Sequence, residues 1–233
     1  MMLRRLLIPL LVLAGLLYGA DRVAHAVAQG VVASALKSAG GLSSSPTVHI
    51  EGFPFLTQAI SGSYDGIELQ ASGVGRGDVR LTRLTVTVRG ARLPLSEALR
   101  GSVGSVPVDS IAGQALMSYA ELAAAIDLPG LSITQEGSGV RLRGPVSVLG
   151  RTVQASAPAT ARLQGTTLLV LPGSVEVQGP STPALRAEAA KALTLRLRLG
   201  TLPFGLRLSD LRTTAAGLTV AARVGPTVLH PTP

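Results

Sequence analysis

A strict alternation of leucine and arginine near the C-terminus constrains the fold more than any other stretch of the chain. Residues 193–200 read "LTLRLRLG". The leucines from Leu193 to Leu199 would share one face of an extended strand, and Arg196 and Arg198 would share the other, because successive strand side chains point to opposite faces. Shorter stretches with the same alternation recur along the chain, separated by glycine or proline turns. We therefore expect a β-rich domain whose sheet has one apolar face.

The sequence also predicts a few short helices and an aliphatic core. Hydrophobic residues make up 46% of the chain but aromatic residues only 3%, so leucine, valine, isoleucine and alanine must fill the interior. Ser118 and Glu121 form a capping box that predicts a helix over residues 119–126. Thr182 followed by Pro183 predicts the start of a second helix. We predict an α+β fold in which a long, curved, mainly antiparallel sheet wraps around an N-terminal helix and these short helices, either closing fully or leaving a groove.

The N-terminal segment has the layout of an export signal. Arg4 and Arg5 precede an uncharged run over residues 6–20, and Asp21 and Arg22 follow at once. As a helix this run would rise about 22 Å, which is short of a hydrocarbon layer of about 30 Å. We expect export to the periplasm or cell envelope, with the segment either removed or kept as an anchor.

Both fates of this segment have support in the residues that follow it. "AHA" at residues 24–26 offers small residues at the spacing of a cleavage site. Valines and an alanine recur every fourth residue over residues 23–35, however, which favours an uncleaved helix leading into the domain. We assign residues 1–26 to an export signal or membrane anchor and residues 27–233 to a single lipid-binding-like domain.

The residues that carry most enzyme chemistry are scarce. The chain has no cysteine, which excludes disulfides, thiolate metal sites and a cysteine nucleophile. His49 and Glu51 resemble half of a zinc-deaminase motif whose other half needs two cysteines. Glu51, Asp65 and Glu68 are close in sequence, but Asp65 precedes glycine as in a turn and Glu68 falls on a polar strand face. We predict no catalytic residue, no metal site and no cofactor.

The charge of the chain points to a membrane surface rather than to nucleic acid. The formal net charge is +8, yet the arginines are scattered along strands and almost no aromatic residues lie between them. Nucleic-acid surfaces need clustered basic residues with interleaved aromatics. Outside the cytoplasm, anionic phospholipid headgroups are the partner that suits a basic protein.

Two Pro-Phe corners contain all three phenylalanines of the chain. The first is "GFPFL" at residues 52–56 and the second is "LPFGL" at residues 202–206. Proline restricts the backbone, and the neighbouring aromatics pack on whatever surface faces them. The corners are either core plugs or the mouth of an apolar groove, with an arginine beside the second corner available to a lipid phosphate. The candidate lipid-binding residues are Phe53, Pro54, Phe55, Leu56, Leu202, Pro203, Phe204 and Arg207.

Three motifs in order give the chain a family resemblance. They are "GFPFLTQAISGSYDGIEL", "SYAELAAAI" and "LPFGLRLSDLRTTAAGLTV". Over residues 21–224 the sequence resembles the LmeA-like phospholipid-binding proteins of actinobacterial cell envelopes, long known as a domain of unknown function. The resemblance implies an exported, membrane-associated protein that binds phospholipid, with a curved sheet and helix similar to the tubular lipid-binding superfamily. It implies no catalytic residues.

The leading hypothesis is therefore a non-enzymatic lipid binder of the envelope. Phospholipid acyl chains would lie in an apolar groove, and the protein would act as a carrier or accessory factor in envelope lipid or lipoglycan maintenance. The alternative is a non-catalytic structural or protein-interaction domain with a closed core. An envelope enzyme acting on lipid or glycan is a third hypothesis, which would need a converging acidic or histidine cluster.

Overall fold

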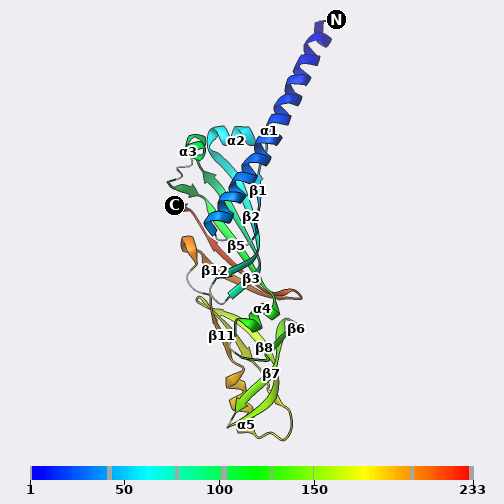
Figure 1. The fold of residues 1–233 in the computed structure, drawn as a ribbon, viewed down its shortest axis with the longest axis vertical. Helices are drawn as coiled ribbons and strands as arrows, with labels where there is room; N and C mark the ends of the chain where they lie inside the picture. Colours follow the sequence, from blue (N-terminus) through cyan, green and yellow to red (C-terminus); the bar gives the residue numbers. More distant parts are fainter. Residues whose placement is uncertain are drawn as a thin grey trace. The chain divides into compact units, whose positions relative to one another are not determined.

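The computed structural model describes residues 2–40, 44–76, 79–100, 104–126, 128–148, 150–199 and 202–230 (Figure 1). The chain divides into two compact units. Unit 1 consists of Met1–Ala71, Thr85–Ile111 and Val224–Pro233, and unit 2 consists of Ser72–Leu84 and Ala112–Arg223. Several long strands contribute residues to both units.

Unit 1 combines a long helix with an antiparallel sheet. Its elements are α1 (Met2–Gly40), β1 (Thr47–Glu51), α2 (Phe55–Ser61), α3 (Leu95–Arg100), β4 (Val106–Val108), β14 (Thr227–Leu229) and part of β2 (Ser63–Arg76), β3 (Val79–Arg92) and β5 (Ser110–Met117). β1 pairs with β2, and β14 pairs with β4. α1 packs against β1 and α2, as Figure 1 shows. Val48 and Ile50 of β1 are buried and alternate with exposed residues, as a half-buried strand requires.

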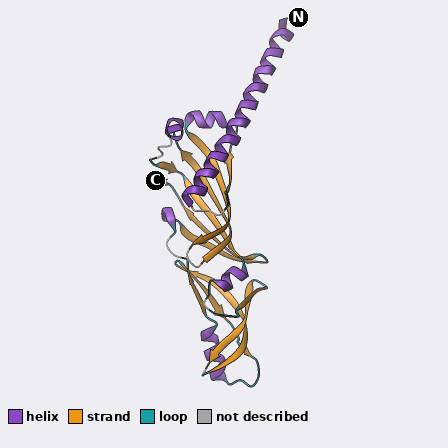
Figure 2. Cartoon of the chain, in the orientation of Figure 1, coloured by secondary structure: helices purple, strands orange, loops and turns teal. Residues whose placement is uncertain are grey.

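Unit 2 is dominated by strands, drawn orange in Figure 2. Its elements are α4 (Tyr119–Ala124), β6 (Ser132–Glu136), β7 (Gly139–Val148), β8 (Arg151–Gln164), β9 (Thr167–Pro172), β10 (Glu176–Val177), α5 (Pro183–Ala192), β11 (Leu195–Arg198), the 3-10 turn η1 (Pro203–Gly205), β12 (Arg207–Thr214) and β13 (Gly217–Val224), together with the remaining parts of β2, β3 and β5. One antiparallel sheet has the order β11-β9-β8-β7-β6, with β10 also paired to β8. β12 and β13 form an antiparallel hairpin. The predicted α+β fold with mainly antiparallel sheets is confirmed.

The core of unit 2 is aliphatic, as the composition predicts. Leu122 of α4, Leu142 of β7 and Leu193 after α5 are completely buried in one cluster with valines and alanines from the central sheet. Burying a leucine side chain stabilises a fold by about 1.5–3 kcal/mol. The two short helices therefore pack on the sheet through a few large side chains, including Leu185 of α5, while the buried Ala189 allows a close approach.

The alternating stretch near the C-terminus behaves largely as predicted. Leu195 is buried and Leu197 is half-buried, whereas Arg196 and Arg198 are exposed. Leu193 differs, because it is the C-cap residue of α5 and lies before the strand begins. The apolar face is thus shared between the end of a helix and the strand that follows it.

The N-terminal segment is one continuous helix. α1 runs without interruption from the apolar segment into the part that packs on unit 1. Within the described residues, one segment, Leu7–Ser38, is long and apolar enough to cross a membrane, and very little of it is buried. The predicted helix after residue 21 is therefore the continuation of the apolar segment.

Gly217 allows the hairpin β12–β13 to lie against the end of β5. Its φ angle is 143°, and a Cβ atom there would collide with the carbonyl oxygen of Met117. Gly165, in the turn between β8 and β9, also has a positive φ of 58°, but open space surrounds it. Comparing substitutions at these two glycines therefore distinguishes the cost of backbone strain from the cost of a steric collision.

We expect Gly217→Ala to destabilise unit 2 by roughly 3 kcal/mol, because strain and collision act together. Gly165→Ala, the matched control, should cost only about 1 kcal/mol, the usual penalty of a left-handed alanine. Urea unfolding of the full chain in detergent measures both changes. If the free energy of unfolding fell equally in the two variants, the contact between Gly217 and Met117 would not be tight.

Candidate functional site

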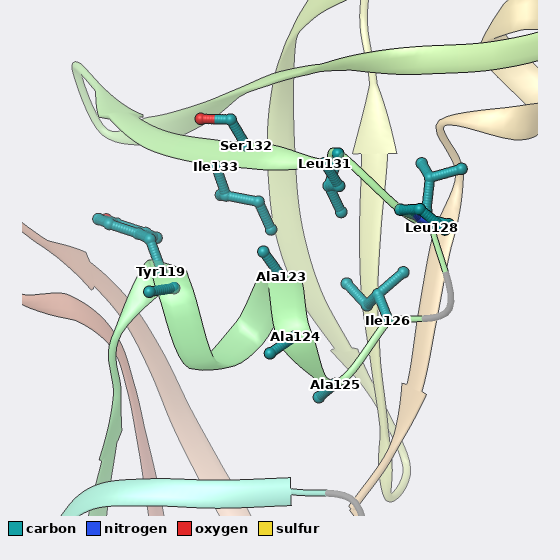
Figure 3. A pocket seen from close by; sticks show the side chains of 12 residues that line it. Tyr119, Ala123, Ala124, Ala125, Ile126, Leu128, Leu131, Ser132 and Ile133 are labelled. Atoms are coloured by element: carbon teal, nitrogen blue, oxygen red, sulfur yellow. The ribbon is translucent and has the colours of Figure 1, made fainter.

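A cleft opens in unit 2 between α4 and β6 (Figure 3). Its volume is about 780 Å³. The side chains along it come from the helix, from the turn that follows and from the first residues of the strand. The lining residues are Tyr119, Ala120, Ala123, Ala124, Ala125, Ile126, Leu128, Pro129, Gly130, Leu131, Ser132 and Ile133. Figure 3 shows Ala123 directed toward Ile133 across the cleft.

Local sequence explains why the helix beside the cleft is short and well placed. The Ser118 hydroxyl accepts a hydrogen bond from the Glu121 amide at 3.2 Å, and the Glu121 carboxylate accepts one from the Ser118 amide at 3.1 Å. This is the capping box that the sequence predicts, and it begins α4 at Tyr119. Small alanine side chains then leave room above the sheet, so the cleft lies where a larger residue would otherwise fill the space.

The floor of the cleft is continuous with the core of unit 2. Leu131 and Ile133 are buried in the core cluster, and Ile126 and Leu128 are half-buried against it. Within the part of the chain that the structure describes, β6 is the last strand in the order of its sheet, so its outer main-chain groups have no strand partner. The lining of the cleft therefore combines aliphatic side chains with main-chain donors and acceptors, and its polar and apolar surfaces are similar in extent.

Polar side chains contribute little to the cleft. Among its described lining residues only Tyr119 and Ser132 carry polar side-chain atoms, and none is charged. The Tyr119 hydroxyl donates a hydrogen bond to the Thr214 carbonyl oxygen at 2.6 Å. Burial raises the pKa of the Tyr119 phenol above its ordinary value of 10.0, so it stays neutral. The described lining therefore offers no charged side chain for acid-base chemistry.

Glu121 belongs to a hydrogen-bonded network behind the cleft. Thr82 and Ser118 donate to its carboxylate, and the Ser118 amide also donates to the Thr82 hydroxyl at 3.0 Å. Burial acts to raise the pKa of Glu121, but the hydrogen bonds from Thr82 and Ser118, aided by the charge of Arg80, lower it below its ordinary value of 4.5. The side chain is therefore ionised at neutral pH and serves as a helix cap.

The first Pro-Phe corner lies in unit 1, at the start of α2. The peptide bond between Phe53 and Pro54 is cis. Phe53 is 62% exposed, whereas Phe55 is buried with its ring 5.4 Å from that of His25 and 6.4 Å from that of Tyr64. The corner therefore divides into one exposed aromatic and one core aromatic.

Residues of α1 hold this corner in place. The Asp21 carboxylate accepts a hydrogen bond from the Leu56 amide at 2.8 Å, and Leu56 itself is half-buried. The guanidinium of Arg22 lies 5.1 Å from the centre of the Phe53 ring and 5.9 Å from that of Tyr18. We refer to Tyr18, Asp21, Arg22, Phe53 and Leu56 as the α1–α2 junction.

The second Pro-Phe corner lies in unit 2, directly before β12. Leu202 is half-buried, and Pro203 begins the 3-10 turn η1. Phe204 has a φ of 57°, a left-handed conformation that is rare for a bulky residue, and it is 48% exposed. Arg207 is exposed at the start of β12 and lies opposite Arg223 of β13 in the strand register.

The eight residues predicted to bind lipid thus belong to two different units, four in each. None of them lines the cleft beside α4. Sequence reasoning found the helix of the cleft but not the cleft itself. A usable signal was available, because an alanine-rich capped helix is followed directly by "LPGLSI", a turn leading into an apolar strand.

The other residues with potential for chemistry lie mainly around β1, where the ring centres of His25 and His49 are 6.1 Å apart. His49 is exposed on β1, opposite Glu68 in the register with β2. No group of three or more histidine, aspartate and glutamate side chains that could hold a metal ion occurs in the part of the chain that the structure describes. These side chains therefore do not form a candidate centre.

Comparison with known proteins decides the family. The family model described as LmeA-like phospholipid-binding matches residues 19–223. The chain belongs to this LmeA-like family. The resemblance that the three sequence motifs indicate is thus confirmed. No significant match was found among curated proteins or among solved structures.

Two of the motifs typical of this LmeA-like chain meet in unit 2. "SYAELAAAI" contains α4, and "LPFGLRLSDLRTTAAGLTV" contains β12 and the first half of β13. Tyr119 donates to the Thr214 carbonyl, and Gly217 lies against the backbone of Met117. The hairpin therefore supports the helix that borders the cleft.

We expect the stabilisation supplied by Glu121 to depend on pH. Because its pKa is lowered in the folded protein, its contribution is fully present above the ordinary glutamate pKa and is lost as pH falls through the folded value. Glu121→Gln keeps an acceptor for the Ser118 amide but loses the charge, so it should cost about 0.5–1 kcal/mol at neutral pH. Urea unfolding from about pH 7 to about pH 3 should show this difference shrinking.

Glu188→Gln on α5 provides the control for this measurement. Glu188 pairs with Lys191 on the surface at 2.6 Å, and such exposed pairs contribute little. The proposed role of the ionised carboxylate would be contradicted if the free energy of unfolding differed between Glu121→Gln and the wild type by the same amount at every pH.

Proposed function

We propose that the protein is an exported cell-envelope protein that binds phospholipid through its acyl chains. In this proposal it acts without catalysis, as a carrier or accessory factor in envelope lipid or lipoglycan maintenance. The observation that carries the proposal is the match of the LmeA-like phospholipid-binding family to residues 19–223. The apolar N-terminal helix is compatible with export.

The cleft between α4 and β6 is the proposed site for an acyl chain. Its volume of about 780 Å³ falls in the range of about 300–1,000 Å³ that is typical of small-molecule sites. Its floor is aliphatic, and each buried methylene contributes about 0.8 kcal/mol to binding. The outer main-chain groups of β6 would bind the ester groups next to the acyl chain at the edge of the cleft.

The second Pro-Phe corner is the proposed contact for the headgroup region. The left-handed conformation of Phe204 costs on the order of 1 kcal/mol, and such strain in an exposed aromatic favours a binding role over a packing role. Arg207 and Arg223 lie directly opposite each other, an arrangement that repels in water. An anionic phosphate between the guanidinium groups would relieve this repulsion.

The two Phe-containing corners do not have the same proposed role. Phe55 is buried against His25 and Tyr64, which makes it part of the core of unit 1. Phe53 remains available because most of its ring is exposed. From the first corner we therefore propose lipid contact for Phe53, with Pro54 and Leu56 shaping the corner.

A structural or protein-interaction role is the second candidate. It is favoured by the closed interior of unit 2, in which Leu122, Leu142 and Leu193 are fully buried. A lipid would then have to bind at the edge of this core rather than inside it. Measurement of bound lipid distinguishes the two candidates.

The first test is to fill the cleft. Ala123→Phe places a ring between α4 and β6, and we expect it to lower bound phospholipid at least tenfold. Ala187→Phe, on the exposed face of α5 outside the cleft, should leave bound lipid unchanged. Native mass spectrometry with lipid extraction on the exported full chain measures the adducts, and circular dichroism checks that both variants fold.

Two outcomes would count against the proposed function. Wild-type protein that carries no phospholipid and takes up none from anionic vesicles would favour the structural role. Equal lipid occupancy in Ala123→Phe and Ala187→Phe would retain lipid binding but exclude the cleft as its site.

Arg207→Gln tests the proposed phosphate contact. We expect binding to anionic vesicles to weaken several-fold, because a basic residue near an anionic surface contributes about 1 kcal/mol. Arg151→Gln, at the start of β8, removes the same charge from another exposed position of unit 2 and should have a smaller effect. Vesicle flotation at low and high salt measures the binding of both variants. Identical losses of vesicle binding would indicate general electrostatic attraction rather than a phosphate contact at Arg207.

A further inference from the structure

Two side chains of α1 that contact β1 and α2 lie on the N-terminal side of the cleavage site that the sequence suggests. The side chain of Asp21 is only 4% exposed, and its carboxylate accepts the Leu56 amide hydrogen at 2.8 Å. His25 Nε2 lies 2.8 Å from the carbonyl oxygen of Ile50 on β1 and donates to it. Cleavage after Ala26 would remove both side chains.

Loss of Asp21 would leave the start of α2 without an acceptor. Pro54, its N-cap residue, makes no side-chain hydrogen bond to the helix. A carboxylate near a helix N-terminus also interacts favourably with the helix dipole. Loss of His25 would in turn uncover the ring of Phe55 in the core. The segment before Ala26 is therefore an integral part of unit 1.

We propose that α1 is retained after export as a membrane anchor, and that Tyr18, Arg22 and Phe53 form a collar at the lipid–water boundary. The partner of this surface is a phospholipid bilayer. The proposal concerns the attachment of the protein to the membrane and does not depend on lipid capture in the cleft beside α4.

The collar has the chemistry of a membrane interface. The rings of Tyr18 and Phe53 lie 6.0 Å apart, and the Arg22 guanidinium lies over both. Arg22 also pairs with Asp21 at 2.6 Å, which fixes its position. Tyrosine and tryptophan rings are enriched where the hydrocarbon layer meets water, and an arginine there can bind lipid phosphate.

The helix on the N-terminal side of the collar is suited to the hydrocarbon layer. Its large apolar side chains from Leu7 to Leu17 are all exposed, and this part of the helix stands clear of the strands of unit 1 (Figure 1). The uncharged residues 6–17 rise about 18 Å as a helix, and long arginine side chains, such as those of Arg4 and Arg5 before them in the sequence, can extend to the opposite interface. A bilayer accommodates a span shorter than its hydrocarbon layer by thinning locally. The exposed helix and the collar thus form one continuous membrane-contacting surface.

The first experiment determines the N-terminus and the attachment of the exported full chain. Intact-mass measurement should find the segment before Ala26 present, and the protein should stay in the membrane fraction after an alkaline carbonate wash. Asp21→Ala should increase cleavage after Ala26, while Asp65→Ala, which removes an exposed carboxylate of unit 1, should not. A wild-type mass that begins at Val27, or full release by carbonate, would overturn the proposal.

The second experiment locates the collar with single tryptophans, since the chain has none of its own. Phe53→Trp in proteoliposomes should show blue-shifted emission and strong quenching by lipids brominated near the headgroup. Val31→Trp is the matched control, because Val31 is 64% exposed on α1, close to the 62% of Phe53. Position 31 lies about 20 Å along the helix from Tyr18. The emission of a tryptophan there should therefore be neither blue-shifted nor quenched.

Tyr18→Trp repeats the measurement from the helix side in case Phe53→Trp folds poorly. Quenching of Val31→Trp as strong as that of the collar positions would indicate a helix lying flat on the membrane and would contradict the proposal. Absence of quenching at both collar positions would also contradict it. Neither result changes the amount of lipid extracted from the cleft, so the two proposals fail separately.

Discussion

Asp21 brings a carboxylate from α1 to the start of α2, a helix whose proline N-cap supplies no acceptor of its own. The carboxylate is nearly inaccessible to water, and Arg22 balances its charge. Removing one partner of such a buried contact is costly because the remaining polar group stays unpaired. The position of α2 in turn places Gln58, which bridges the Glu51 carbonyl and the Asp65 amide and so ties β1 to β2. The organisation of unit 1 thus depends on a residue that composition alone would assign to the end of a leader.

The parts of the fold that follow from local rules were predictable. The capping box at Ser118 and the Thr182 cap with Pro183 both begin helices as the sequence indicates. α4 nevertheless ends at Ala124, before the predicted end at residue 126. The alternation around Leu195 identifies the inner face of a strand because a period of two is a property of the backbone itself. α2 was not foreseen, since its cap comes from a residue 35 positions earlier in the chain.

The candidate site was less predictable for a related reason. A cleft forms where side chains are too small to fill the space between two elements. Here Ala123 lies opposite Ile133, and no sequence motif marks that pair. The sequence predicts lipid contact for both Phe53 and Phe55. In the structure Phe55 is a core residue and Phe53 is exposed, although only a proline separates them. Which of two neighbouring aromatics is buried depends on His25 and Tyr64, which come from distant elements.

Unit 1 is assembled from three separate stretches of chain, and its last strand, β14, pairs with β4 across more than a hundred intervening residues. Closing so long a loop has an entropic cost that must be met before the pairing stabilises the unit. Because a chain is synthesised from its N-terminus, α1 is made long before the C-terminal segment that pairs with β4. Unit 2 has all of its residues available earlier and can fold in the meantime. The order of synthesis therefore makes the pairing of β14 with β4 a late step in the folding of unit 1, and a chain truncated before Thr227 would leave β4 without this partner.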